Sequence, residues 1–131
     1  MTDTESLRRA VEADPDALER RFGEVQSGLE SEDTRRRIDA GRALREAAKH
    51  DPALVEPHRQ LLLDHLPDSN DSVTLSATVG LAELADRDPA AVGEAVPDLT
   101  DVLSETQAPS IEEAASRALK RVGEWSPEVV A

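Results

Sequence analysis

Apolar residues recur along this chain at the spacing of amphipathic helices, and the pattern returns every 37 residues. The first stripe of each copy advances by seven and then four residues, and its members are Leu18, Val25 and Leu29; Val55, Leu62 and Leu66; Val92, Leu99 and Leu103. The second stripe is rich in alanine, with the third copy shifted by one residue: Ala40, Ala43, Leu44 and Ala47; Ala77, Gly80, Leu81 and Leu84; Ala115, Ala118, Leu119 and Val122. Such steps keep one face of a helix buried, so each copy predicts two helices.

An acidic residue followed by proline opens each copy. Asp14-Pro15, Asp51-Pro52 and Asp88-Pro89 lie 37 residues apart, and Ser126-Pro127 follows after 38. Asp or Ser at an N-cap accepts a hydrogen bond from a free backbone N–H. Proline at the first helical position costs no hydrogen bond, because an N–H at that position has no acceptor within the helix. The residue before proline is biased away from helix, so the preceding helix ends there. The dipeptide therefore predicts the boundary between repeats.

These boundaries predict an all-α chain of paired helices. We expect first helices at 15–30, 52–66 and 89–104, second helices at 33–49, 71–86 and 109–124, and a leading helix at 6–13. Leu7 and Ala10 of that leading helix are in register with the second helices, 37 residues before Leu44 and Ala47. A single domain over 1–131 is expected, with a capping half-repeat at 1–13, repeats at 14–50, 51–87 and 88–125, and a truncated tail at 126–131.

Two prolines fall inside the expected first helices. Pro57 and Pro97 would each remove a helical hydrogen bond. We expect a kink at each proline. The alternative is that 52–56 and 89–96 form a separate first turn.

The second helices carry residues typical of a known repeat family. They contain Arg36-Arg37 with Ala40 and Ala43-Leu44; Val73-Thr74 with Ala77 and Gly80-Leu81; and Ile111-Glu112 with Ala115 and Ala118-Leu119. Over roughly residues 14 to 125 the chain resembles the HEAT-repeat family, especially its short, Ala-rich bacterial and archaeal members. The resemblance implies a right-handed α-solenoid whose second helices line the concave surface. Because the arginine of the family pattern is present only as Arg37, we do not expect a regular Asp–Arg ladder between repeats.

Two other repeat families fit less well. TPR units are 34 residues long and carry aromatic residues at set positions. This chain has one Phe, one Trp and no Tyr. Armadillo units have three helices and need a longer period. Helix pairs of about 37 residues therefore remain the better interpretation.

The charge of the chain limits the classes of partner that we expect it to bind. The net charge is -13, with 28 acidic and 15 basic residues. Such a surface repels nucleic-acid phosphates and anionic membranes, so neither is expected as a partner. The acidic excess with only two lysines resembles proteins of salt-adapted archaea. The start of the chain lacks the pattern of a signal peptide, and we expect a cytoplasmic protein.

No arrangement of residues indicates catalysis, a metal or a cofactor. The absence of cysteine excludes disulfides and thiolate sites, and no HExxH motif, phosphate loop or nucleophile elbow is present. His58 and His65 are about 10 Å apart along a helix, too far to share one ion, and with His50 they are expected to be surface residues. A small HEAT-type lyase or isomerase acting on a bilin chromophore, or a related cofactor-handling protein, is the alternative to a scaffold.

Basic residues gather on the expected helix 33–49. Residues 1–50 have a net charge of -2, whereas 51–131 have -11. The segment Arg35 to Arg45 could hold an acidic segment of another protein, or its arginines could pair with Asp33, Asp39 and Glu46 and with neighbouring helices. The run of basic residues does not continue along the expected helix 71–86, which argues against a nucleic-acid groove. The expected partner-binding residues are Arg35, Asp39, Arg42, Ser76, Val79 and Arg117.

Trp125 is the only tryptophan and directly precedes Ser126-Pro127. We expect its ring to cover the end of the core; stacking on a ligand is the alternative.

Overall fold

The described part of the chain, residues 3–126 of the computed structural model, is entirely helical, with side chains described from Glu5 onward. It contains eight α-helices: α1 (Asp3–Ala13), α2 (Ala17–Arg20), α3 (Phe22–Leu29), α4 (Thr34–His50), α5 (Arg59–Asp64), α6 (Asp71–Arg87), α7 (Val96–Glu105) and α8 (Pro109–Trp125). Three 3-10 segments complete it: η1 (Pro52–Leu54), η2 (Glu56–His58) and η3 (Pro89–Ala95). The predicted all-helical class and the positions of the second helices are confirmed within one or two residues.

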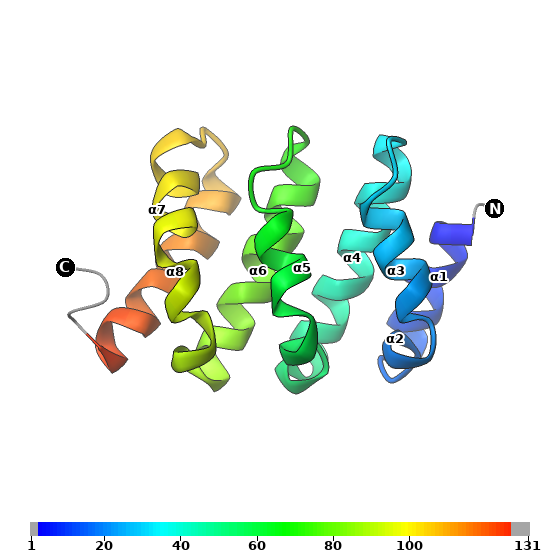
Figure 1. Ribbon diagram of the computed structural model, residues 1–131, viewed down its shortest axis with the longest axis horizontal. Helices are drawn as coiled ribbons and strands as arrows, with labels where there is room; N and C mark the ends of the chain where they lie inside the picture. Colours follow the sequence, from blue (N-terminus) through cyan, green and yellow to red (C-terminus); the bar gives the residue numbers. More distant parts are fainter. Residues whose placement is uncertain (1–2, 127–131) are drawn as a thin grey trace.

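The helices lie in two layers (Figure 1). The long helices α1, α4, α6 and α8 form one layer, in which each contacts the next. The shorter helices α3, α5 and α7 lie in front of them in Figure 1, and each packs on the second helix that follows it in the chain. The buried apolar side chains from Leu7 to Val122 form one contiguous cluster. No helix within residues 3–126 is long and apolar enough to cross a membrane.

The predicted stripes account for most of this cluster. Leu18, Val55 and Val92 are fully buried, and so are Val25, Leu62 and Leu99. On the second helices Ala40, Leu44 and Leu81 are buried, whereas Leu119 in the last copy is only partly buried. Alanine and glycine have small side chains and let the second helices approach closely. The core is therefore filled although the chain has almost no aromatic side chains.

Side chains cap several helices as expected. The carboxylate of Asp51 caps η1 by accepting a hydrogen bond from the backbone N–H of Ala53. Asp14 accepts one from the backbone N–H of Asp16 in the turn before α2, which begins only at Ala17 and has no side-chain cap bond. Asp88 makes no side-chain cap bond. At the second helices, Asp33 accepts from Arg35 N–H at 2.9 Å, and Asn70 accepts from Ser72 N–H at 2.9 Å.

The kinks expected at Pro57 and Pro97 are replaced by a division of every first helix. Each first helix is broken at the same register position: Arg21, His58 and Ala95, 37 residues apart. Arg21 (φ -114°, ψ 22°) and His58 (φ -112°, ψ 17°) share nearly one backbone conformation. The first copy has no proline near the break, so proline does not cause it. The two prolines sit in the first turn of η2 and α7, where a missing N–H costs no helical bond.

Candidate interaction surface

The layer formed by α4, α6 and α8 carries a shallow hollow of about 270 Å³. We call it the second-helix hollow. It is lined by one residue set from each of the three helices: Arg45 and Lys49; Leu75, Val79 and Glu83; Ser110, Glu113, Ala114 and Arg117. Its floor is partly apolar and its edges are charged, as at the margins of many protein–protein contacts.

The α4 side of this hollow is positively charged. The only ion-pair neighbour of Arg45 among the described residues is Glu46, at 4.0 Å, and Arg45 Nε is buried without a hydrogen-bond partner there. Burial lowers the pKa of Arg45 from its usual value, Glu46 and Glu12 oppose that shift, and nearby Arg42 adds to it. Arginine remains charged in spite of such a shift. An anionic group would therefore relieve both the desolvation and the repulsion from Arg42.

Two further cations on α4 add to this side. Lys49 is exposed and Arg42 is half-buried, and neither has an ion pair recorded within residues 3–126. Arg42, Arg45 and Lys49 stand at steps of three and four residues, so they form one stripe along α4. The stripe ends in the last turn of the helix, where the helix dipole also favours cations.

The arginines on the opposite side of the hollow are already paired. Arg117 on α8 donates to Glu83 on α6 at 3.0 Å and lies 3.9 Å from Asp86. Arg121 lies 3.0 Å from the same Asp86. These pairs connect α6 to α8, and Glu113, which also lines that side, is an exposed carboxylate with no ion pair recorded among the described residues. The free positive charge of the hollow therefore lies on α4.

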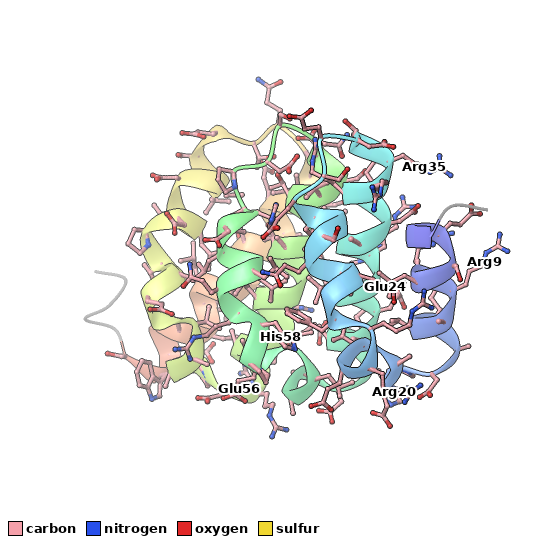
Figure 2. All side chains as sticks on the ribbon, turned by 45° about the vertical axis from the view of Figure 1, so that its right-hand side comes forward. Arg9, Arg20, Glu24, Arg35, Glu56 and His58 are labelled. Atoms are coloured by element: carbon pink, nitrogen blue, oxygen red, sulfur yellow. The ribbon has the colours of Figure 1, made fainter. Side chains whose placement is uncertain are left out.

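The structure brings only some of the predicted contact residues together. Val79 and Arg117 line the hollow, and Arg42 lies one turn before Arg45 on α4. Arg35 stands apart near the start of α4, where its side chain is 72% exposed and points into solvent (Figure 2). Lys49 was not predicted, although its position one turn after Arg45 could have indicated it.

Asp39 and Ser76 lie beneath the surface and not on it. Each is 1% exposed, because α1 packs over Asp39 and Gly41 of α4 packs against Ser76. Asp39 lies 3.9 Å from Arg8 on α1 and 3.9 Å from Arg35. Neither side chain presents a polar group to a partner in this arrangement. Both instead belong to the contacts between successive second helices.

The arginines of α4 follow both alternatives that the sequence left open. Arg35 approaches Asp39, and Arg37 pairs with Asp68 of the next repeat at 3.2 Å. Arg36 and Arg42 have no ion pair recorded within the described residues. Internal pairing therefore accounts for part of the cluster and leaves the stripe at Arg42 to Lys49.

The histidines are less exposed than the sequence suggested. His58 in η2, labelled in Figure 2, stacks on Phe22 of α3, with ring centroids 3.7 Å apart and planes inclined by 16°. His65 lies 3.8 Å from Asp68, and only His50 is exposed, at the end of α4. Within the described residues, no group of three or more His, Asp or Glu side chains is placed to hold a metal ion.

Trp125 covers the end of the core only in part. It is 52% exposed, and its ring lies close to Gly93, where an added Cβ would meet Cζ3 at 3.8 Å. The ring, which belongs to the last turn of α8, therefore packs against η3.

Comparisons with protein-family models, with curated proteins and with solved structures find no match to this chain.

Proposed function

We propose that this protein is a non-enzymatic scaffold that binds an acidic segment of another protein in the second-helix hollow. The observation that carries the proposal is the positive stripe of Arg42, Arg45 and Lys49 on α4, in which only Arg45 has an ion pair recorded, with Glu46; it lies beside an apolar floor formed by Leu75 and Val79. In a chain of net charge -13, such a stripe stands out from its surroundings. Its helices are packed before a partner arrives, so docking needs little reorganisation.

We further propose that the scaffold is a right-handed α-solenoid of HEAT type. The 37-residue register supports this, because it relates the caps, core positions and helix breaks of successive copies. The second helices also contact one another in chain order. In such an arrangement α4, α6 and α8 would line the concave surface, and the hollow would lie within it.

The main interaction would combine contact packing with short-range ion pairing. Because Arg45 Nε is buried, a partner carboxylate would contact the part of the Arg45 side chain that is exposed, which is 22% of it, and the exposed Lys49. If the cell interior is molar in salt, the Debye length is about 3 Å, so long-range attraction contributes little. Direct contact with the stripe would then set the affinity.

A capture experiment tests this function. The immobilised protein should retain a stoichiometric protein partner from native lysate in high salt. The variant Arg42→Glu/Lys49→Glu should lose that partner, whereas the control Arg9→Glu/Arg20→Glu, which makes the same charge change at two exposed positions on α1 and α2, should keep it. Equal retention by both variants would contradict docking at the stripe. A tetrapyrrole that co-purifies without any protein would favour the lyase or isomerase class instead.

A further inference from the structure

A second hollow, separate from the second-helix hollow, is surrounded by acidic side chains. This groove of about 350 Å³ lies between the α5–α6 turn and the helices α7 and α8. Its floor is apolar and is formed by Leu66, Val102 and Ile111. Four exposed carboxylates stand around it: Asp71, Asp98, Asp101 and Glu105. We call it the acidic groove.

The preceding repeat contains an arginine in the corresponding place. The Arg37 guanidinium on α4 donates to Asp68 Oδ2 at 3.2 Å and to the carbonyl oxygens of Ser31 and Glu32 at 3.1 Å each. It fills the space between the α3–α4 turn and the α5–α6 turn. Its side chain is only 14% exposed. A guanidinium is therefore already bound once in this fold, at the junction of the first two repeats.

The next junction has the acceptor without the donor. Thr74 lies 37 residues after Arg37, and Glu105 lies 37 residues after Asp68. Thr74 is too short to reach across, and its hydroxyl donates to the carbonyl oxygen of Asp68 at 3.1 Å. Both Thr74 and Glu105 line the acidic groove. The groove thus occupies the position in which an arginine side chain sits one repeat earlier.

The charges around the groove remain uncompensated. Within residues 3–126, none of Asp71, Asp98, Asp101 and Glu105 has an ion-pair partner. Asp68 at the groove's edge is already paired with Arg37. Residues 51–131 carry a net charge of -11, and none of the basic residues described there has an ion pair recorded with these four carboxylates. A positively charged group from outside the chain would complement it.

We propose that the acidic groove binds an arginine side chain on an exposed segment of a partner protein, in the place that Arg37 fills at the preceding junction. The planar guanidinium presents five donors in a fork that fits paired carboxylates, and its methylene stem would cover Leu66, Val102 and Ile111. Lysine, a compact and strongly hydrated cation, would fit less well. This site is distinct from the second-helix hollow, which attracts acidic groups.

Amide chemical shifts of the labelled protein, titrated with a short peptide, test the proposal. The probe is acetylated and amidated Gly-Ser-Gly-Leu-Arg-Leu-Gly-Ser-Gly. We expect the largest shifts at Thr74, Asp101 and Thr106. Replacing the peptide's arginine with uncharged citrulline should weaken binding by about tenfold or more, because a charged hydrogen bond is lost. Equal affinities, shifts centred elsewhere, or no shifts would overturn the proposal.

Variants of the protein give an independent test. Asp101→Asn/Glu105→Gln removes two rim charges from exposed positions and should weaken binding of the arginine peptide by about tenfold. The control Asp16→Asn/Glu30→Gln makes the same change far from the groove and should bind as the unaltered protein does. If both doubles bind alike, the groove is not the site.

The most direct variant adds an arginine side chain at the groove itself. Thr74→Arg places an arginine at the register of Arg37, so it should occupy the groove from within and abolish peptide binding; Ser116→Arg, exposed on α8, is the control for added charge. Unaltered binding by Thr74→Arg would overturn the proposal. So would self-association of the unaltered protein that Thr74→Arg abolishes, since a second copy would then be the occupant. Arg42→Glu/Lys49→Glu should bind the arginine peptide normally, which separates this site from the second-helix hollow.

Discussion

Arg37 on α4 donates through Nε to Oδ2 of Asp68, 3.2 Å away, and so ties one second helix to the turn that begins the next. The two side chains are 14% and 9% exposed. Asp68 also accepts the backbone N–H of Asn70 at 2.9 Å through its other oxygen. The pair therefore joins two successive repeats through nearly buried, well-bonded groups.

Removal of Arg37 should destabilise the protein. Arg37→Ala leaves the Asp68 carboxylate and the carbonyl oxygens of Ser31 and Glu32 without their donor. We expect the free energy of unfolding in urea to fall by about 2–4 kcal/mol, as is usual when one partner of a buried ion pair is lost. Arg37→Lys should recover only part of this, because lysine cannot bridge all of these acceptors.

Arg9 supplies the matched control. Its pair with Glu5 is also at 3.2 Å, but the Arg9 side chain is 57% exposed. Arg9→Ala should change the free energy of unfolding by less than about 0.5 kcal/mol, since solvent screens exposed pairs. Similar costs for Arg9→Ala and Arg37→Ala would contradict a structural role for the contact between Arg37 and Asp68.

The sequence predicted the helices well because the repeat supplies three views of one pattern. The apolar register identified Leu44 and Leu81 as core, and the Asp-Pro dipeptides at Asp51 and Asp88 located the ends of α4 and α6. The sequence favoured kinks at Pro57 and Pro97, and it gave a separate first turn at 52–56 and 89–96, which is closer to the structure, only as the alternative. The break at Arg21, His58 and Ala95 depends on how the short leading segments pack on the core, and proline drew attention to the wrong cause.

The site was harder to predict than the fold. Periodicity placed Arg42, Val79 and Arg117 on one face, where the structure has them on or next to the hollow. It could not show that Asp39 and Ser76 are buried, because short polar side chains look like surface residues in a sequence. Their burial depends on the close approach of successive second helices, a tertiary distance that no local pattern encodes.

Leu81→Ala should be among the costlier single truncations. Leu81 is 1% exposed and belongs to α6, the helix that packs against both α4 and α8. We expect a loss of roughly 2–5 kcal/mol in the free energy of unfolding, because the side chain leaves a cavity. Leu119 occupies the same register in the last copy but is only partly buried, so Leu119→Ala should cost at least about 1 kcal/mol less. A near-neutral Leu81→Ala would contradict this register.

Two glycines should respond to alanine with opposite signs. A Cβ on Gly80 would lie 3.0 and 3.2 Å from the two terminal carbons of Leu62, which is fully buried and has little room to move. Gly80→Ala should therefore lower the free energy of unfolding by about 1–3 kcal/mol. A Cβ on Gly23 in α3 would meet nothing within 4 Å, and Gly23→Ala should raise it by about 0.5–1 kcal/mol through helix propensity. Stabilisation by both changes would show that Leu62 yields easily.

The stack of His58 on Phe22 should make the stability of the protein depend on pH. Burial lowers the pKa of His58 from its usual 6.5, and Glu19 opposes that shift. When the pH falls below about 6.5, the unfolded chain binds a proton at His58 before the folded chain does, so the free energy of unfolding decreases until the folded-state pKa is passed.

Urea unfolding between about pH 7.5 and 5.5, above the range in which carboxylates titrate, measures this effect. Relative to His58→Gln, which cannot titrate, the unaltered protein should lose stability as the pH falls. An NMR titration should give His58 a pKa below the usual value of a histidine. If the two proteins lose stability in parallel, the desolvation of His58 is not coupled to folding.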